Sequence, residues 1–307
     1  MLLADRLNTT AAQLRSTSWL QLALYAYLAF IGIGVLRQAL PDELAAALRP
    51  AGLLLPLMLI AAKDLAHAPD ALGRLRSARG WGERITALLP PELVGMFRLD
   101  RLVWSGFAQW LLRRKPAPAP EGVELAYLQR GAYGTAVGVA MVALFLELPI
   151  NVLLINLWVA DADMRLVIHV VGGIGALYSF VWVLGDRWHV GNGCHAIADG
   201  VLQLCVGVRS QGSIPLCAIE RCERVDEAPE RWRRRHGIHA SETLLVTPFD
   251  KPNCVLVLKA EAGVTLLHWQ VRRKAPRYVL MYVDRPELLA SWVGGGSRPT
   301  IGPKPVT

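Results

Sequence analysis

"LFLELPINVLL" (residues 144–154) places a carboxylate, Glu147, inside a long apolar run. Pro149 and Asn151 follow within four residues. In a bilayer, a segment of this kind must satisfy its backbone within a helix, and a buried glutamate costs at least ~2 kcal/mol. The stretch therefore raises two questions: which solvent surrounds Glu147, and what its carboxylate does.

The composition answers the first question. Of the 307 residues, 53% are hydrophobic and 19% are charged, and the mean hydropathy is +0.33. Soluble domains carry about 25% charged residues. The composition predicts membrane helices joined to a water-exposed part.

Four segments are long and apolar enough to be candidate spans, since a helix needs roughly 20 apolar residues to cross the hydrocarbon core. The second is the weakest, because its uncharged part is short and Arg49 would have to reach the interface. The third contains Glu147 as its only formal charge. The predicted spans are Ser16–Leu36, Leu44–Ala62, Gly131–Ala160 and Leu166–Gly185.

The distribution of Lys and Arg predicts the orientation. Residues 63–130 hold eleven of them, whereas the turn "ADADMR" between the last two spans holds one. Because basic loops stay on the cytoplasmic side, and an even number of spans puts both ends on one side, we expect both termini to be cytoplasmic in the inner membrane.

The segment 63–130 is predicted to be a cytoplasmic linker containing an amphipathic helix at 91–115, which ends in Arg113, Arg114 and Lys115. This helix could lie in the membrane interface with its basic end on anionic head groups, or it could pack on the protein's own spans. The sequence leaves both possibilities open.

After Gly185 the pattern changes to short alternating runs. Leu202, Leu204, Val206 and Val208 share one face of a predicted strand that follows an Asp-Gly turn. About seven strands, "GVTLLHWQV" among them, and a closing helix at 285–292 capped by Asp284 predict a small all-β domain with a C-terminal helix.

Three motifs carry a family resemblance: "DGVLQLCVGVRSQGSIPLCAIERCERV", "FDKPNCVLVLK" and "VDRPELLASWV". In this order they resemble the bacterial PH-like domain over about residues 186–293. The resemblance implies a cytosolic interaction or scaffolding module with no catalytic residues to carry over. Residues 227–242 depart from the family's pattern and read as an inserted basic loop.

Glu147 lies near mid-bilayer, ~24 Å from the inner end of its span. Asn151, His169 and Tyr178 are the other intramembrane polar candidates, with Tyr178 at a similar depth and His169 nearer the outside. Glu147 could bind a proton, a cation or a polar substrate. Alternatively, it could tie two spans together or bind a partner helix.

The run "RWRRRH" contains Arg231, Arg233, Arg234 and Arg235, which are candidates for binding anionic lipid unless the run is a solvated loop. It lacks the interleaved aromatic residues of a nucleic-acid surface, so no nucleic-acid partner is expected. No catalytic fingerprint occurs in the chain, and "WHVGNGCH" offers no obvious fourth metal ligand, so no catalytic residue, cofactor or metal is assigned.

The sequence therefore predicts an α-helical membrane domain of four spans and an all-β PH-like domain. It favours a membrane-anchored binding or scaffolding subunit with a membrane or cytosolic protein partner. The alternative is a small transporter or membrane enzyme that uses Glu147. The expected parts are 1–62 (two spans), 63–130 (linker), 131–185 (two spans), 186–293 (PH-like domain) and 294–307 (disordered tail).

Overall fold

The computed structural model describes residues 19–294 except 39, 117 and 119–120. The chain divides into two compact units, Met1–Val94 and Gly95–Thr307, each treated by itself. The expected disordered tail lies outside the described residues, apart from Gly294, which ends the last helix.

The first unit is helical. Its two longer helices, α2 (Trp19–Gln38) and α4 (Arg49–Ala66), pack against each other. The short helices α3 (Asp42–Ala47), α5 (Ala68–Ser77) and α6 (Trp81–Leu88) connect and follow them. The next helix, α7 (Pro91–Leu111), crosses the boundary between the units.

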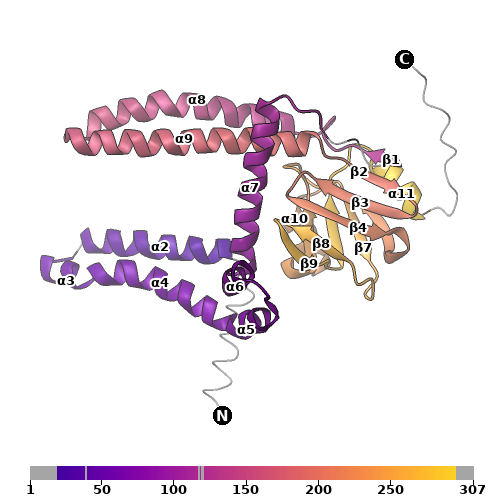
Figure 1. Cartoon of the computed structure of the whole chain (residues 1–307), viewed down its shortest axis with the longest axis horizontal. Helices are drawn as coiled ribbons and strands as arrows, with labels where there is room; N and C mark the ends of the chain where they lie inside the picture. Colours follow the sequence, from indigo (N-terminus) through magenta and orange to yellow (C-terminus); the bar gives the residue numbers. More distant parts are fainter. Residues whose placement is uncertain (1–18, 39, 117, 119–120, 295–307) are drawn as a thin grey trace, which may run out of the picture. The chain divides into compact units, whose positions relative to one another are not determined.

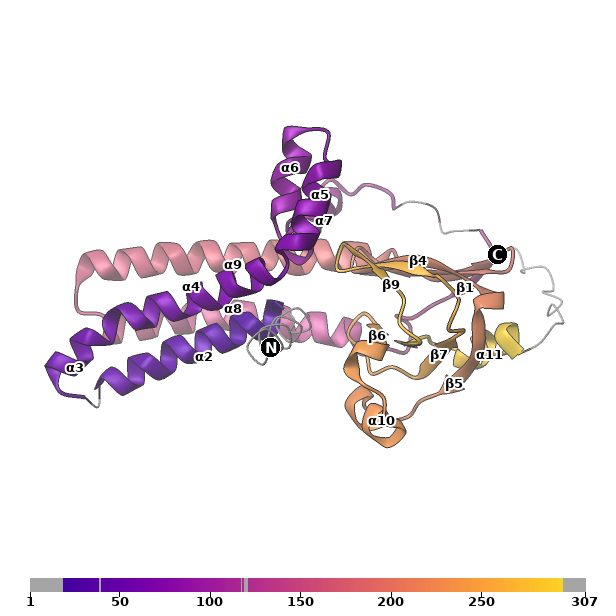
Figure 2. The ribbon, with the colours of Figure 1, turned by 90° about the horizontal axis from the view of Figure 1, so that it is seen from below.

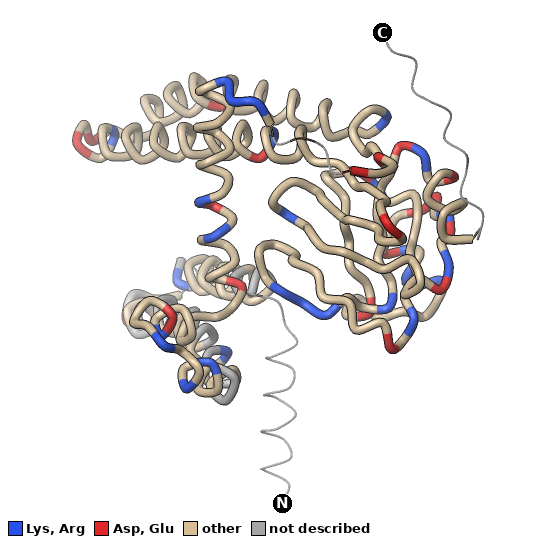
Figure 3. Tube along the Cα trace, turned by 45° about the vertical axis from the view of Figure 1, so that its right-hand side comes forward, with Lys and Arg blue, Asp and Glu red and all other residues tan. Residues whose placement is uncertain are grey.

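The second unit contains a long antiparallel pair, α8 (Tyr133–Trp158) and α9 (Ala162–Gly191). In the described residues these two helices are long and apolar enough to cross a membrane, whereas Leu24–Arg37 in α2 is apolar but shorter. Of the four expected spans, two are therefore supported. Long stretches of both helices carry no charge in Figure 3, and residues such as Phe145 and Val171 are more than 60% exposed, as lipid-facing side chains would be.

The β region consists of two sheets, which Figure 2 shows as two layers. The six-stranded sheet has the order β1-β2-β3-β4-β8-β9, and the four-stranded sheet has the order β5-β7-β10-β6. The strands of the first sheet are β1 (Val123–Leu125), β2 (His195–Ala198), β3 (Val201–Val206), β4 (Ser210–Pro215), β8 (Thr265–His268) and β9 (Val271–Lys274). Those of the second are β5 (Ile219–Arg224), β6 (Thr243–Val246), β7 (Cys254–Leu258) and β10 (Tyr278–Met281).

The core lies between the sheets. The predicted face of β3 is buried, with Leu202 and Val206 fully enclosed, and every residue of β7 is buried. The closing helix α11 (Pro286–Gly294) packs against β5. The coarse expectation of apolar helices joined to a β-rich region is therefore confirmed.

Strand β1 comes from the segment that was expected to be a linker. It pairs antiparallel with β2 through the register Val123↔Ile197 and Leu125↔His195. Leu125 and the following Tyr127 are 2% and 1% exposed. The first strand of this sheet therefore precedes the two long helices in the chain. The β region is discontinuous in sequence and begins well before residue 186.

Two turns account for differences from the expected strands. Between Ile214 and Val225, a 3₁₀ turn at Leu216–Ala218 moves the chain from one sheet to the other, so this apolar run is divided between two strands. The run "GVTLLHWQV" was read as one strand. It is a hairpin, because Trp269 and Gln270 adopt positive φ angles of 50° and 60°. Neither residue type signals such a turn.

Two further expectations are wrong in detail. The stretch expected to be an inserted loop contains the helix α10 (Pro229–His236), whose Trp232 is 3% exposed and packs edge-on against Tyr278. Asp284 does not act as the expected side-chain cap of α11. Its carboxylate accepts hydrogen bonds from the backbone N–H groups of Gln129 and Arg130, at 2.9 and 3.0 Å.

Candidate functional site

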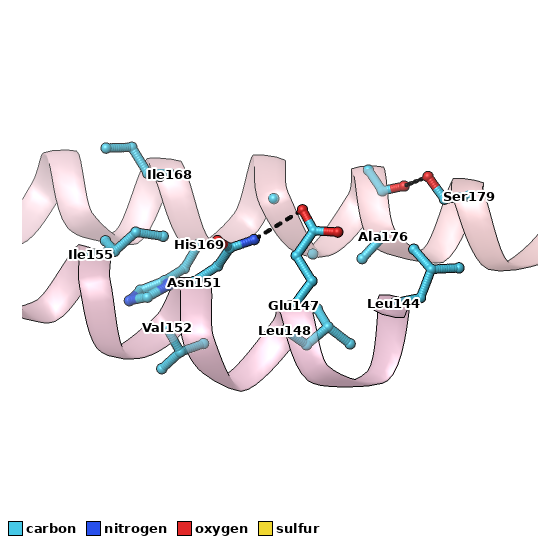
Figure 4. Close-up of a pocket in the computed structure, with 13 residues that line it drawn as sticks. Leu144, Glu147, Leu148, Asn151, Val152, Ile155, Ile168, His169, Ala176 and Ser179 are labelled. Carbon is cyan, nitrogen blue, oxygen red and sulfur yellow. Dashed lines mark hydrogen bonds between the residues drawn. The ribbon is translucent and has the colours of Figure 1, made fainter. Parts of the chain in front are cut away.

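A groove of about 500 Å³ lies between α8 and α9 (Figure 4). Glu147 and Asn151 line it from α8, and His169 and Ser179 line it from α9. The apolar side chains around them include Leu144, Val152, Ile155 and Ile168. This is the site that the sequence indicated through Glu147.

Glycines in α9 create the space. Gly172, Gly173 and Gly175 line the groove, and a methyl group added at any of them would meet no atom within 4 Å. The helix α8 continues through Pro149 without a break. Within the described residues, these three positions therefore face open space.

The polar contacts differ from those expected. Asn151 Nδ2 donates to Glu147 Oε1 at 3.3 Å, one helical turn along α8. Tyr178 does not meet Glu147, because its hydroxyl donates to Asp100 Oδ1 of α7 at 2.5 Å. His169, which was expected nearer the outside, lines the same groove as Glu147. The groove therefore unites three of the four predicted polar residues.

A carboxylate, an amide and an imidazole along one groove can hold a proton or a small cation. They can also accept a hydrogen bond from a side chain of a neighbouring helix. An ionisable group within a span is expensive unless it meets such a partner. In the described residues, Asn151 is the hydrogen-bond partner of Glu147, and it belongs to the same helix.

A second polar cluster lies at the end of the helix pair, and sequence reasoning missed it. Asp186 of α9 is 3% exposed. Its carboxylate accepts hydrogen bonds from Nε and Nη2 of Arg209, at 2.7 and 2.5 Å. The hydroxyl of Tyr133, in the first turn of α8, donates to the same carboxylate at 2.9 Å. This cluster joins both long helices to the β3–β4 turn. Its signal in the sequence was Asp186, which directly follows twenty uncharged residues.

Two more contacts join the helices to the β region. Tyr127 donates to the carbonyl of Val190 at 3.0 Å, and burial raises the pKa of the Tyr127 hydroxyl. Asp250 accepts a hydrogen bond from the backbone N–H of Ala132, at the start of α8. An acidic side chain at this position satisfies a backbone donor that the helix leaves open and complements the helix dipole.

The part of α7 that follows Gly95 packs across α9. Gly106 and Gly185 meet at the crossing, where a methyl group on Gly106 would lie 2.6 Å from the Gly185 carbonyl oxygen. His189 Nε2 lies 2.8 Å from the carbonyl of Leu102. On the same helix, Phe97 and Leu111 are 61% and 62% exposed. Of the two possibilities left open, packing on α9, one of the two candidate spans, is observed, and exposed apolar residues remain available for an interface.

The predicted basic candidates fall at two places. Arg231, Arg234 and Arg235 are exposed on α10, where Arg235 pairs with Glu227 at 2.7 Å and Arg233 pairs with Glu230 at 3.4 Å. Arg113, Arg114 and Lys115 are exposed just after α7 ends. Partial pairing with glutamates reduces the positive charge that α10 offers to an anion.

No group of three or more His, Cys, Asp or Glu side chains within the described ranges is placed to hold a metal ion. His195 is fully buried, and its Nδ1 accepts the backbone N–H of Cys205 at 3.0 Å. Burial lowers the pKa of His195 to about 3. This histidine therefore belongs to the core of the β region.

Comparison with known proteins found no match: no protein family, no curated protein and no solved structure resembles the chain closely enough to be identified.

Proposed function

We propose that this chain is an inner-membrane subunit that binds or scaffolds other proteins through a cytoplasmic, PH-like β region. In this proposal α2 and α4 are the first two spans, and α8 and α9 are the last two. Both termini are then cytoplasmic, because the basic segment 63–130 must lie on that side. The motifs in 186–293 support the PH-like assignment by resemblance.

One observation carries the proposal. The β region is attached to the paired helices by the buried Asp186–Arg209 ion pair as well as by the intervening chain. Tyr127 and Asp250 add hydrogen bonds at the ends of α9 and α8. A buried charge pair with this geometry holds its elements in one arrangement, because breaking it leaves an uncompensated charge. A domain held in this way offers its partners a surface of fixed orientation at the membrane.

The partner is expected to be a membrane or cytosolic protein. The test is to purify the full chain in a mild detergent and to measure the mass of the complex and the stoichiometry of any protein in it. We expect a stoichiometric protein partner to copurify with the wild-type chain. The Asp186→Asn variant should lose this partner, because the attachment of the β region to the helices is weakened. The matched control Asp163→Asn, at an exposed aspartate, should keep it. Recovery of the wild-type chain alone would contradict the proposal.

The groove supports a second candidate, a small transporter or membrane enzyme. The supporting observation is that Glu147, Asn151 and His169 line one groove between the two long apolar helices. In this case Glu147→Gln should abolish the transport of protons or cations into proteoliposomes, or the turnover of a polar substrate. Folding and assembly should stay unchanged. If the variant instead loses the partner protein or unfolds at lower temperature, the carboxylate has a structural role.

A further inference from the structure

The level of the bilayer surface can be placed on the second unit. Leu166–Gly185 contains no formal charge, and twenty helical residues span about 30 Å, the thickness of the hydrocarbon core. Asp186 follows at once and bonds to Tyr133 in the first turn of α8. The two helices therefore leave the hydrocarbon at the same level, which the Asp186–Arg209 pair marks.

Two turns of the β region lie at this level. Arg209 also donates to the carbonyl of Pro248, and its guanidinium carbon lies 5.8 Å from the centre of the Trp269 ring. Phe249 and Trp269 are 71% and 44% exposed. Large exposed aromatic side chains next to the ends of two spans are typical of the membrane–water interface.

The edge strand β9 continues from the same turn. Its first residue is in close contact with α7, since a methyl group on Gly95 would lie 2.7 Å from Val271 Cγ2. Arg272, Arg273 and Lys274 follow, and all three are exposed. At ~3.3 Å per residue they lie within about 10 Å of this contact, a distance comparable to the Debye length at physiological salt.

We propose that Phe249, Trp269, Arg272 and Lys274 form a membrane-contacting edge that rests on the head groups of the chain's own bilayer and binds anionic lipid. This rests on the proposed function, in which α8 and α9 are spans: the edge adjoins the ends of those helices, so the bilayer surface is its neighbour. Its positive charge is complementary to phosphate-bearing head groups. Among the described residues, neither Arg272 nor Lys274 forms an ion pair that would neutralise it.

The test compares the full chain in nanodiscs of phosphatidylcholine alone with nanodiscs that also contain phosphatidylglycerol. Amide hydrogen exchange is followed in 265–274 and, as an internal reference, in the buried strand β7. We expect exchange in 265–274 to slow roughly tenfold with the anionic lipid, and the effect to fade as salt is raised. Exchange in β7 should not change.

The decisive variant is Arg272→Gln with Lys274→Gln, which should remove the effect of the anionic lipid without changing exchange in β7. The matched control is Arg231→Gln with Arg234→Gln, which removes the same charge from α10 and should leave the effect intact. Adding inorganic phosphate to neutral nanodiscs should not reproduce it. Equal exchange in the two lipids, or loss of the effect in the α10 variant alone, would overturn the proposal.

Discussion

Asp186 Oδ2 and Arg209 Nη2 lie 2.5 Å apart and join the end of the long apolar helix α9 to a β turn twenty-three residues later. The side chains are 4% and 15% exposed, so water screens the pair weakly. Arg209 also donates to Pro248 and lies over Trp269. This one arginine thus links α9 to two separate turns of the β region.

Replacing Asp186 with Asn should destabilise the second unit by about 3–5 kcal/mol, because Arg209 would be left with an uncompensated charge. Thermal unfolding in detergent measures the loss. A double variant, Asp186→Asn with Arg209→Met, should recover part of it. A single variant as stable as the wild type would show that the pair does not hold the two parts together.

Gly185→Ala should separate α7 from α9, because the added methyl group would overlap the backbone carbonyl of Val103. The expected result is faster hydrogen exchange in 95–111 and a lower melting temperature. Gly173→Ala is the matched control, since a methyl group there meets nothing within 4 Å. The same response from both variants would mean that the substitution acts through helix propensity and not through the contact between α7 and α9.

The stability of the β region should fall as the pH is lowered. Burial lowers the pKa of His195 to about 3 from its ordinary value of 6.5, so the unfolded chain binds a proton that the folded chain excludes. The contribution is fully present above pH 6.5 and is lost on going towards pH 3. Between pH 7 and pH 5 it amounts to about 2 kcal/mol.

The measurement for this prediction is the melting temperature of wild type and His195→Gln at pH 7 and pH 5. The variant should be less stable at pH 7 but lose less on acidification. His239→Gln, at an exposed histidine, should keep the wild-type pH dependence. His268, whose pKa burial lowers to about 4, adds acid sensitivity of the same sign in all three proteins.

Asp284→Ala should release the segment that precedes α8. The carboxylate accepts two backbone N–H groups, from Gln129 and Arg130, and charged acceptors contribute about 1.5–3 kcal/mol per bond. Proteolysis should then cut near residue 129 faster than in wild type, while cleavage in 226–241 should be unchanged. Uniformly faster cleavage would indicate general unfolding.

Much of the architecture could be predicted from local patterns. Long uncharged runs marked α8 and α9, and alternation marked the buried face of β3. The Asp199-Gly200 turn was predicted from its residue types, which tolerate the positive φ angles of 49° and 76° that the turn requires. The turn at Trp269 and Gln270 was missed, because tertiary hydrogen bonds to Arg209 and Val208 stabilise it in place of local propensity.

The candidate site divides in the same way. Glu147 stands out in the sequence as the one charge in a long apolar run, and the cost of a charge in lipid makes it a candidate site. Asn151 lies one turn away on the same helix, so their contact is local. For Tyr178 the sequence predicted only a depth similar to that of Glu147, because depth along a helix does not specify direction around it. Its partner Asp100 lies 78 residues away.

The sequence by itself determined that apolar helices are joined to a β-rich region and that one carboxylate lies within a long apolar helix, because hydrophobic periodicity and the position of a charge in an apolar run are local properties. Tertiary structure alone decided that β1 joins the sheet from before the two long helices, that Asp186 meets Arg209, and that β9 lies beside α7. Those pairings depend on which surfaces exclude water together, and residues far apart in the chain contribute to each of them.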